Sequence, residues 1–81
     1  SKIKLSWKQI IGVDGYEIVR YNTKKKAYKK IKTLTNPKTV SYTDKGLKKR
    51  TKYKYKIRAY QKNGTKKVYG FYSNPKNGMT R

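Results

Sequence analysis

Apolar and charged residues alternate with a period of two along most of this chain, and the pattern is clearest over residues 52–60. The apolar set comprises Tyr53, Tyr55, Ile57 and Ala59. The set between them comprises Lys52, Lys54, Lys56, Arg58 and Tyr60. Successive side chains of a β-strand point to opposite faces of a sheet, so the alternation predicts a strand with one buried and one solvent-facing side. Shorter segments of the same kind at 3–7, 16–19 and 39–43 extend the prediction to an all-β fold.

Turn signals separate these segments at intervals of about one strand. Asp or Asn combines with Gly or Pro at residues 14–15, 36–37, 44–46, 63–64 and 74–75. Such spacing is typical of a sandwich or a small barrel, and the richness in Tyr, Thr, Ile and Val disfavours helix. Asn63-Gly64 predicts a hairpin with a type I′ turn, because both residues tolerate positive φ. The lysines at 24–26 lie between two candidate strands and are predicted to form a solvated loop.

The charge is extreme, with 24 Lys and Arg residues against three acidic residues and a net charge of +21. Self-repulsion at this charge opposes compaction and favours polyanionic partners. Twenty of the cations are lysines. Lysine acts as a point charge, whereas arginine suits bidentate recognition of bases and phosphates, so the composition indicates a diffuse anionic environment rather than a reader of nucleic-acid sequence. A solvated surface that only keeps the domain soluble accounts for the same charge.

Residues for catalysis and metal binding are scarce. The chain has no histidine and no cysteine, which removes the usual nucleophilic triads, thiolate chemistry and most transition-metal sites. Its acids are Asp14, Glu17 and Asp44, too few for a calcium site, and we interpret Asp14 as a turn residue and Glu17 as a surface residue that offsets nearby lysines. We therefore expect no catalytic residue, no metal site and no cofactor. No apolar run reaches the roughly 18 residues of a membrane span.

The order and spacing of several segments resemble those of a fibronectin type III domain. Residues 3–7, 16–21, 41–44 and 53–60 resemble the second, third, fifth and sixth strands of that family, and residues 72–75 resemble the start of its last strand. Leu47 and Tyr53, six residues apart, resemble its tyrosine corner, in which the tyrosine hydroxyl ties back to the preceding loop. Lys49 and Arg50 stand where the family usually has Pro-Gly.

The resemblance implies an Ig-like antiparallel β-sandwich of six to seven strands, with the first strand truncated or missing. Asp14-Gly15 would cross between the two sheets, and the third and sixth strands would lie side by side. Residues 1–81 would form a single domain, excised from a larger multidomain chain. The lysine- and tyrosine-rich sequence is similar to versions repeated in secreted and surface proteins of Gram-positive bacteria. The integrin-binding tripeptide Arg-Gly-Asp of some family members is absent.

Two sets of residues follow from this arrangement. The residues expected in the core are Trp7, Tyr16, Ile18, Leu47, Tyr53 and Ile57. The opposite face would carry a basic row beside two amphipathic rings, formed by Lys52, Lys54, Lys56, Arg58, Tyr21 and Tyr60. Lysines can act as counterions of an anionic polymer and tyrosines as stacking surfaces, so this face is the candidate binding site for a polyanion or a glycan. A solvated strand face whose lysines prevent aggregation is the alternative.

The function expected from these features is that of a non-catalytic spacer or adhesion module in an extracellular, secreted or cell-wall-associated protein. Its partners would be neighbouring domains of the parent chain and an anionic wall polymer or polysaccharide. A carbohydrate-binding auxiliary module of a secreted hydrolase is an alternative, with Tyr21 and Tyr60 as sugar platforms. A nucleic-acid-binding domain is a further alternative, which the excess of lysine over arginine disfavours.

Overall fold

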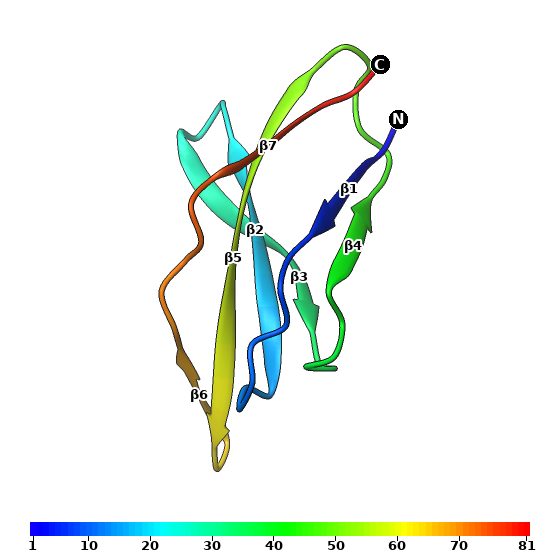
Figure 1. The fold of residues 1–81 in the computed structure, drawn as a ribbon. Coiled ribbons are helices and arrows are strands. Elements are labelled where there is room, and N and C mark those ends of the chain that lie inside the picture. The colour runs from blue at the N-terminus through cyan, green and yellow to red at the C-terminus, as the bar shows by residue number, and fades with distance from the viewer.

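The computed structural model describes residues 1–81 and contains seven β-strands and no helix (Figure 1). The strands are β1 (Ile3–Ser6), β2 (Gly15–Asn22), β3 (Ala27–Leu34), β4 (Ser41–Asp44), β5 (Lys52–Asn63), β6 (Lys66–Tyr69) and β7 (Lys76–Met79). The alternating segments of the sequence therefore form strands, as predicted. Residues 1–2 are not part of a strand, and the last strand, β7, is short.

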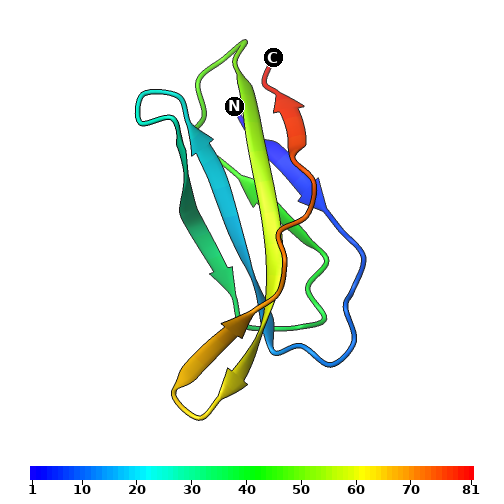
Figure 2. The same cartoon turned by 90° about the vertical axis from the view of Figure 1, so that its left-hand side faces the viewer.

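The strands form two antiparallel sheets that pack as layers (Figures 1 and 2). The smaller sheet pairs β1 with β4, and the larger sheet has the order β3-β2-β5-β6. The long strand β5 pairs with β6 near its end and with β7 near its start, so these two short strands share one of its edges. The chain changes sheet between β1 and β2, which confirms the crossover expected at Asp14-Gly15. The predicted adjacency of the third and sixth strands is the β2–β5 pair.

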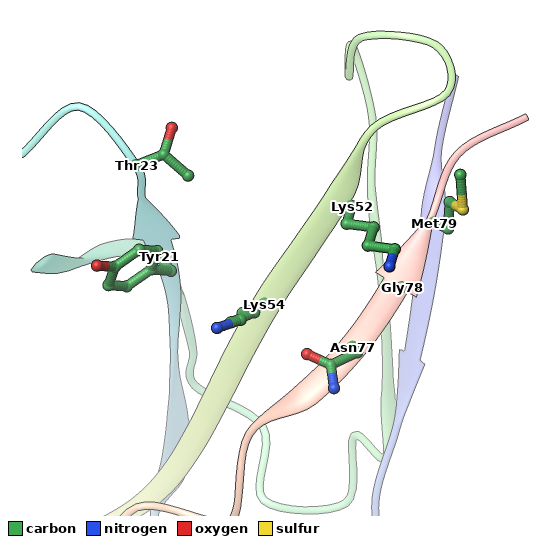
Figure 3. A pocket seen from close by; sticks show the side chains of 7 residues that line it. All are labelled: Tyr21, Thr23, Lys52, Lys54, Asn77, Gly78 and Met79. Atoms are coloured by element: carbon green, nitrogen blue, oxygen red, sulfur yellow. The ribbon is translucent and has the colours of Figure 1, made fainter. Parts of the chain in front are cut away.

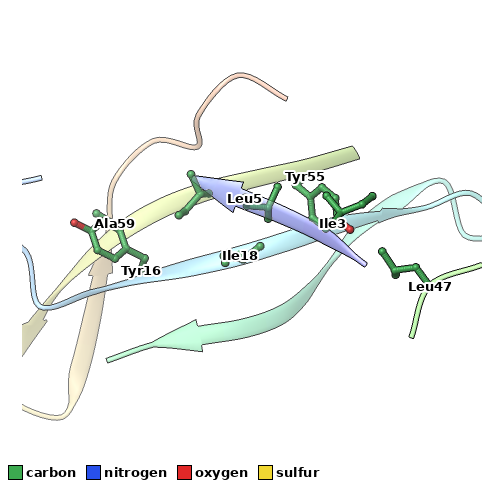
Figure 4. Close-up of a cluster of buried hydrophobic side chains, with 8 residues drawn as sticks. Ile3, Leu5, Tyr16, Ile18, Leu47, Tyr55 and Ala59 are labelled. Atoms are coloured by element: carbon green, nitrogen blue, oxygen red, sulfur yellow. The ribbon is translucent and has the colours of Figure 1, made fainter. Parts of the chain in front are cut away.

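The core lies between the sheets and is made mainly of aliphatic and tyrosine side chains (Figure 4). Its buried members are Ile3, Leu5, Tyr16, Ile18, Leu47, Tyr55, Ile57 and Ala59. Of the other residues expected there, Trp7 and Tyr53 are partly buried and pack against this cluster. The Trp7 ring lies 5.7 Å from the Tyr16 ring. Full burial of a side chain such as Ile18 stabilises the fold by about 1.5–3 kcal/mol, so a small set of residues carries much of the stability.

The loop between β4 and β5 forms the tyrosine corner. The hydroxyl of Tyr53 accepts a hydrogen bond from the main-chain N–H of Lys48 at 3.0 Å. Thr80 ties the C-terminal segment to the same loop, because its hydroxyl accepts from the main-chain N–H of Thr51 and donates to the carbonyl of Lys48. Arg50 in this loop has φ of 53°, in the left-handed region that favours glycine.

Replacing Arg50 with glycine is therefore expected to stabilise the domain by about 0.5–1 kcal/mol. An L-residue in the left-handed conformation costs about 1–2 kcal/mol, and the greater freedom of glycine in the unfolded chain offsets part of the gain. Urea unfolding followed by tryptophan fluorescence measures the change. Lys49→Gly, in the same turn at a residue without positive φ, is the control and should destabilise.

The hairpin between β5 and β6 differs from the prediction in its turn type. Only Gly64 has positive φ, at 66°, while Asn63 remains in β5 and pairs with Lys66. The two-residue loop is thus Gly64-Thr65, and glycine at its first position is the arrangement of a type II′ turn. The type I′ prediction was wrong because it placed Asn63 in the loop rather than in the strand. Residues 24–26 are exposed and form the turn between β2 and β3, as predicted.

Candidate functional site

The outer face of the larger sheet carries three cations from consecutive outward positions of β5. Lys54, Lys56 and Arg58 form this row, which we call the cation ladder. Arg58 lies opposite Glu17 and Lys56 lies opposite Val19 on the neighbouring strand β2. The period of two places these residues on the face that points away from the core.

Each cation of the ladder lies over at least one tyrosine ring. The Lys54 ammonium is 5.6 Å from the centre of the Tyr21 ring, and the Lys56 ammonium is 4.5 Å from that of Tyr28. The two tyrosines form a cross-strand pair between β2 and β3, with ring centres 5.2 Å apart. A cation over an exposed aromatic face gains about 0.5–1 kcal/mol, so these contacts order long side chains that would otherwise be mobile.

Arg58 has the densest surroundings on this face. Its guanidinium lies 3.7 Å from the centre of the Tyr69 ring and 4.5 Å from that of Tyr72. It also forms an ion pair with Glu17, at 2.9 Å from Nη2, and the Tyr72 hydroxyl donates to the same carboxylate oxygen at 3.2 Å. Glu17 is 5% exposed. The interpretation of Glu17 as a surface residue was therefore wrong, since Arg58 and Tyr72 cover it.

Tyr60 points outward but is buried, which contradicts its proposed role as a stacking platform. Its exposed fraction is 1%. The ring lies against Gly15, whose missing side chain leaves room for it, and its hydroxyl donates to the Leu34 carbonyl at 3.5 Å. Burial, with the nearby charge of Asp14, raises the pKa of Tyr60. The Lys67 ammonium lies 4.7 Å from the centre of the ring.

Of the remaining residues of the predicted binding face, Tyr21 is half-buried and Lys52 is exposed. Tyr21 has Lys54 over its ring, and Lys52 lies at the start of β5. Val19, which points outward between the rows of cations, is only 3% exposed. The centre of this face, around Val19 and Glu17, is therefore closely packed, whereas Lys52 and Lys54 at one end of it are exposed to solvent.

All three acids of the chain are held by internal hydrogen bonds. Asp14 accepts from the main-chain N–H of Lys62 at 2.6 Å. Asp44 accepts from Arg20 and from the Tyr55 hydroxyl, each at 2.7 Å. The ion pairs of the structure are Arg20–Asp44 and Arg58–Glu17, so no lysine has a carboxylate partner. No group of three potential metal ligands occurs.

The buried Tyr55 hydroxyl gives the domain a pH-dependent stability. Burial first, and then the hydrogen bond and charge of Asp44, raise the pKa of Tyr55 above its ordinary value of 10. The folded chain keeps this proton at a pH where the unfolded chain has released it. The stabilisation that the protonated Tyr55 hydroxyl gives to the fold is thus fully present below pH 10. Above pH 10 the free energy of unfolding falls by about 1.4 kcal/mol per pH unit.

Tyr55→Phe should therefore lose stability more slowly than the wild type above pH 10, although it is less stable at neutral pH. Urea unfolding at several alkaline pH values measures both slopes. Both proteins carry the same lysines, so lysine titration cancels in the comparison. Parallel slopes would show that Tyr55 does not hold its proton in this way.

The structure contains no helix that is long and apolar enough to span a membrane.

Neither the curated proteins nor the solved structures compared with this chain include a match. The family model for the fibronectin type III domain matches residues 1–73. Domains of that family are non-catalytic modules, typically found in extracellular or surface proteins with several domains. Because the match spans far more than half of the chain and the seven antiparallel strands follow the expected order, this chain belongs to the fibronectin type III family.

Proposed function

We propose that this domain is a spacer or adhesion module of an extracellular or cell-surface protein and that it associates electrostatically with anionic wall polymers such as teichoic acids. One observation carries the proposal: all three acids are engaged in structural contacts, and no lysine has a carboxylate partner. The surface charge is thus uncompensated at every lysine. A polyanion supplies the missing counter-charge and releases its own bound counterions when it binds.

The cation ladder supports this function because aromatic contacts position charge without neutralising it. A salt bridge would neutralise the charge of Lys54 or Lys56, whereas contact with a tyrosine ring leaves the solvent side of the ammonium group free to bind an anion. Ordering these side chains in advance also lowers the entropy lost on binding, which is about 0.5–1.5 kcal/mol for each long side chain.

The alternative functions receive less support from the same residues. Carbohydrate binding relied on Tyr21 and Tyr60 as platforms, but Tyr60 is buried and Tyr21 carries a lysine on its ring. Binding of nucleic acid through base stacking meets the same obstacle at these two rings. A diffuse lysine surface fits a flexible polymer without a recognised sequence.

The domain acts beside further domains of a longer chain, and residues 1–81 form one such unit. We infer an extracellular location with a Gram-positive wall as the setting, because domains of this family are commonly extracellular and the positive charge suits an anionic partner. The spacer role requires only a stable fold, whereas the adhesion role requires the polymer.

Co-sedimentation with Gram-positive wall sacculi tests the adhesion role. Sacculi that retain teichoic acid should retain the domain at low salt and release it as salt rises, and sacculi stripped of teichoic acid should retain little. An unrelated fibronectin type III domain of neutral net charge is the control for trapping in the pellet. Equal retention by both kinds of sacculi would remove teichoic acid as the partner and leave the spacer role alone.

A further inference from the structure

The two central strands of the larger sheet separate at one end. Main-chain pairing between β2 and β5 ends at Arg20 opposite Tyr55, although β2 continues to Asn22 and β5 begins at Lys52. The first residues of β5 pair instead with β7, on the opposite edge of the strand. Figure 3 shows the resulting divergence, with Tyr21 and Thr23 on one side and Lys52 and Lys54 on the other.

Two hollows meet at this divergence. One has a volume of about 530 Å³ and lies towards β7, and the other has a volume of about 340 Å³ and lies towards the loop before β5. Both linings include Tyr21, Thr23 and Lys52, so the two hollows adjoin at these residues. Volumes of this size are typical of sites for small or segmental ligands. We call the combined feature the lysine cleft.

The charges that line the lysine cleft are all positive. Lys24, Lys29, Lys48, Lys52 and Lys54 contribute ammonium groups, and none of them has a carboxylate partner. Arg20 also lines the cleft but is paired with Asp44. A concave surface with charges of one sign concentrates ions of the opposite sign more strongly than a convex one. This concave shape distinguishes the lysines of the cleft from the many lysines on exposed strands and turns.

The aromatic rings of the cleft limit which anion fits it. Tyr21 has the Lys54 ammonium over its ring, and Tyr53 has the Arg20 guanidinium 5.7 Å from its ring centre. One face of each ring is therefore covered by a cation and does not offer a stacking surface to a nucleobase. The unpaired cations of the cleft are lysines, which bind phosphate as point charges without reading a planar group. The chemistry favours a phosphate chain whose spacers are not aromatic.

We propose that the lysine cleft is the principal binding site for a phosphodiester polymer with polyol spacers, with successive phosphates meeting lysines in its two hollows. This rests on the proposed function and adds to it the location of the binding site. The cation ladder adjoins the cleft through Lys54 and continues the positive surface away from it along β5. A bound chain would thus enter the cleft and run along the ladder.

Two triple variants with the same loss of charge test the location. Lys24→Gln/Lys29→Gln/Lys48→Gln removes three cleft lysines, and Lys32→Gln/Lys62→Gln/Lys66→Gln removes three exposed lysines outside the cleft. Fluorescence anisotropy with labelled poly(glycerol phosphate) measures the affinity at about 0.15 M salt. The cleft variant should bind at least about tenfold more weakly than the wild type, and the control variant no more than about threefold, because only the former loses phosphate contacts. Thermal unfolding verifies that both variants are folded.

The other outcomes separate this proposal from the proposed function. Equal weakening of both variants would overturn the cleft as the site while leaving electrostatic adhesion intact. Absence of binding by the wild type would overturn both. Single-stranded DNA with the same number of phosphates provides the test of ligand class, and tighter binding of DNA than of poly(glycerol phosphate) would overturn the choice of a polymer without aromatic groups.

Discussion

Replacement of Asp44 by alanine is expected to lower the free energy of unfolding by about 2–4 kcal/mol. The Asp44 side chain is 9% exposed and accepts hydrogen bonds from both Arg20 and the buried Tyr55 hydroxyl. Its removal leaves a partly buried guanidinium without a counter-charge and a buried hydroxyl without a partner. A domain of this length has only about 4–12 kcal/mol of stability, so the variant should be close to unfolding at elevated temperature.

Asp14→Ala is the matched control, because it changes the net charge equally. Asp14 accepts from the main-chain N–H of Lys62 at an exposed site, so the expected loss is about 1 kcal/mol. Urea unfolding of the two variants under identical conditions gives the comparison. A loss for Asp44→Ala no larger than that for Asp14→Ala would mean that the hydrogen bonds of Asp44 with Arg20 and Tyr55 add nothing to the free energy of unfolding beyond the effect of one negative charge.

Gly15→Ala is expected to destabilise the domain by about 2–3 kcal/mol through crowding alone. A Cβ atom at position 15 would overlap the main-chain carbonyl oxygen of Leu34 and would lie 2.5 Å from the Tyr60 hydroxyl. The carbonyl belongs to the paired strand β3, so it cannot move without disturbing the β2–β3 ladder. The Tyr60 ring would be displaced from its buried position.

Gly70→Ala provides the control for a glycine without this crowding. A Cβ atom there would lie 3.7 Å from the Ala59 carbonyl oxygen, which is an ordinary contact. The expected change is within about 0.5 kcal/mol in either direction. Thermal unfolding distinguishes the two variants, and near-ultraviolet circular dichroism reports the displaced tyrosine. A neutral effect of Gly15→Ala would contradict the close packing of Tyr60 on the outer face.

The alternating sequence made the strands predictable, because burial on one side of a sheet requires a period of two. The pairing of β2 with β5 was predictable from the resemblance to the fibronectin type III family and not from the alternation. The alternation did not reveal how the outer face packs. Tyr60 occupies an outward position, but its burial depends on the absence of a side chain at Gly15 in another strand. Glu17 is likewise an outward residue that becomes buried under Arg58 and Tyr72, which are distant in sequence.

The lysine cleft was also beyond prediction from the sequence, for a geometric reason. Lys24, Lys29 and Lys48 belong to a turn, an edge strand and a loop, and only the divergence of β2 from β5 brings them around one hollow. Lys52 and Lys54 could be assigned to the outer face from alternation alone. The basic row was therefore identified, while the concavity at its end depends on the three-dimensional arrangement.

The three acidic residues of the chain all accept hydrogen bonds from internal donors, and this bears on both the fold and the proposed function. Asp14, Glu17 and Asp44 each satisfy internal donors, and two of them pair with arginines. No carboxylate remains to shield the lysines, so the stability of the fold and the positive surface arise from the same distribution of charge. A surface of this kind is predicted to bind polyanions with a strong dependence on salt.

The most direct test is the affinity of the wild-type domain for poly(glycerol phosphate) as a function of salt concentration. If binding is electrostatic, the logarithm of the association constant should fall linearly with the logarithm of the salt concentration, with a slope of about −2 or steeper for three or more phosphate contacts. A shallow slope with retained affinity at high salt would contradict electrostatic association and would direct attention to apolar contacts instead.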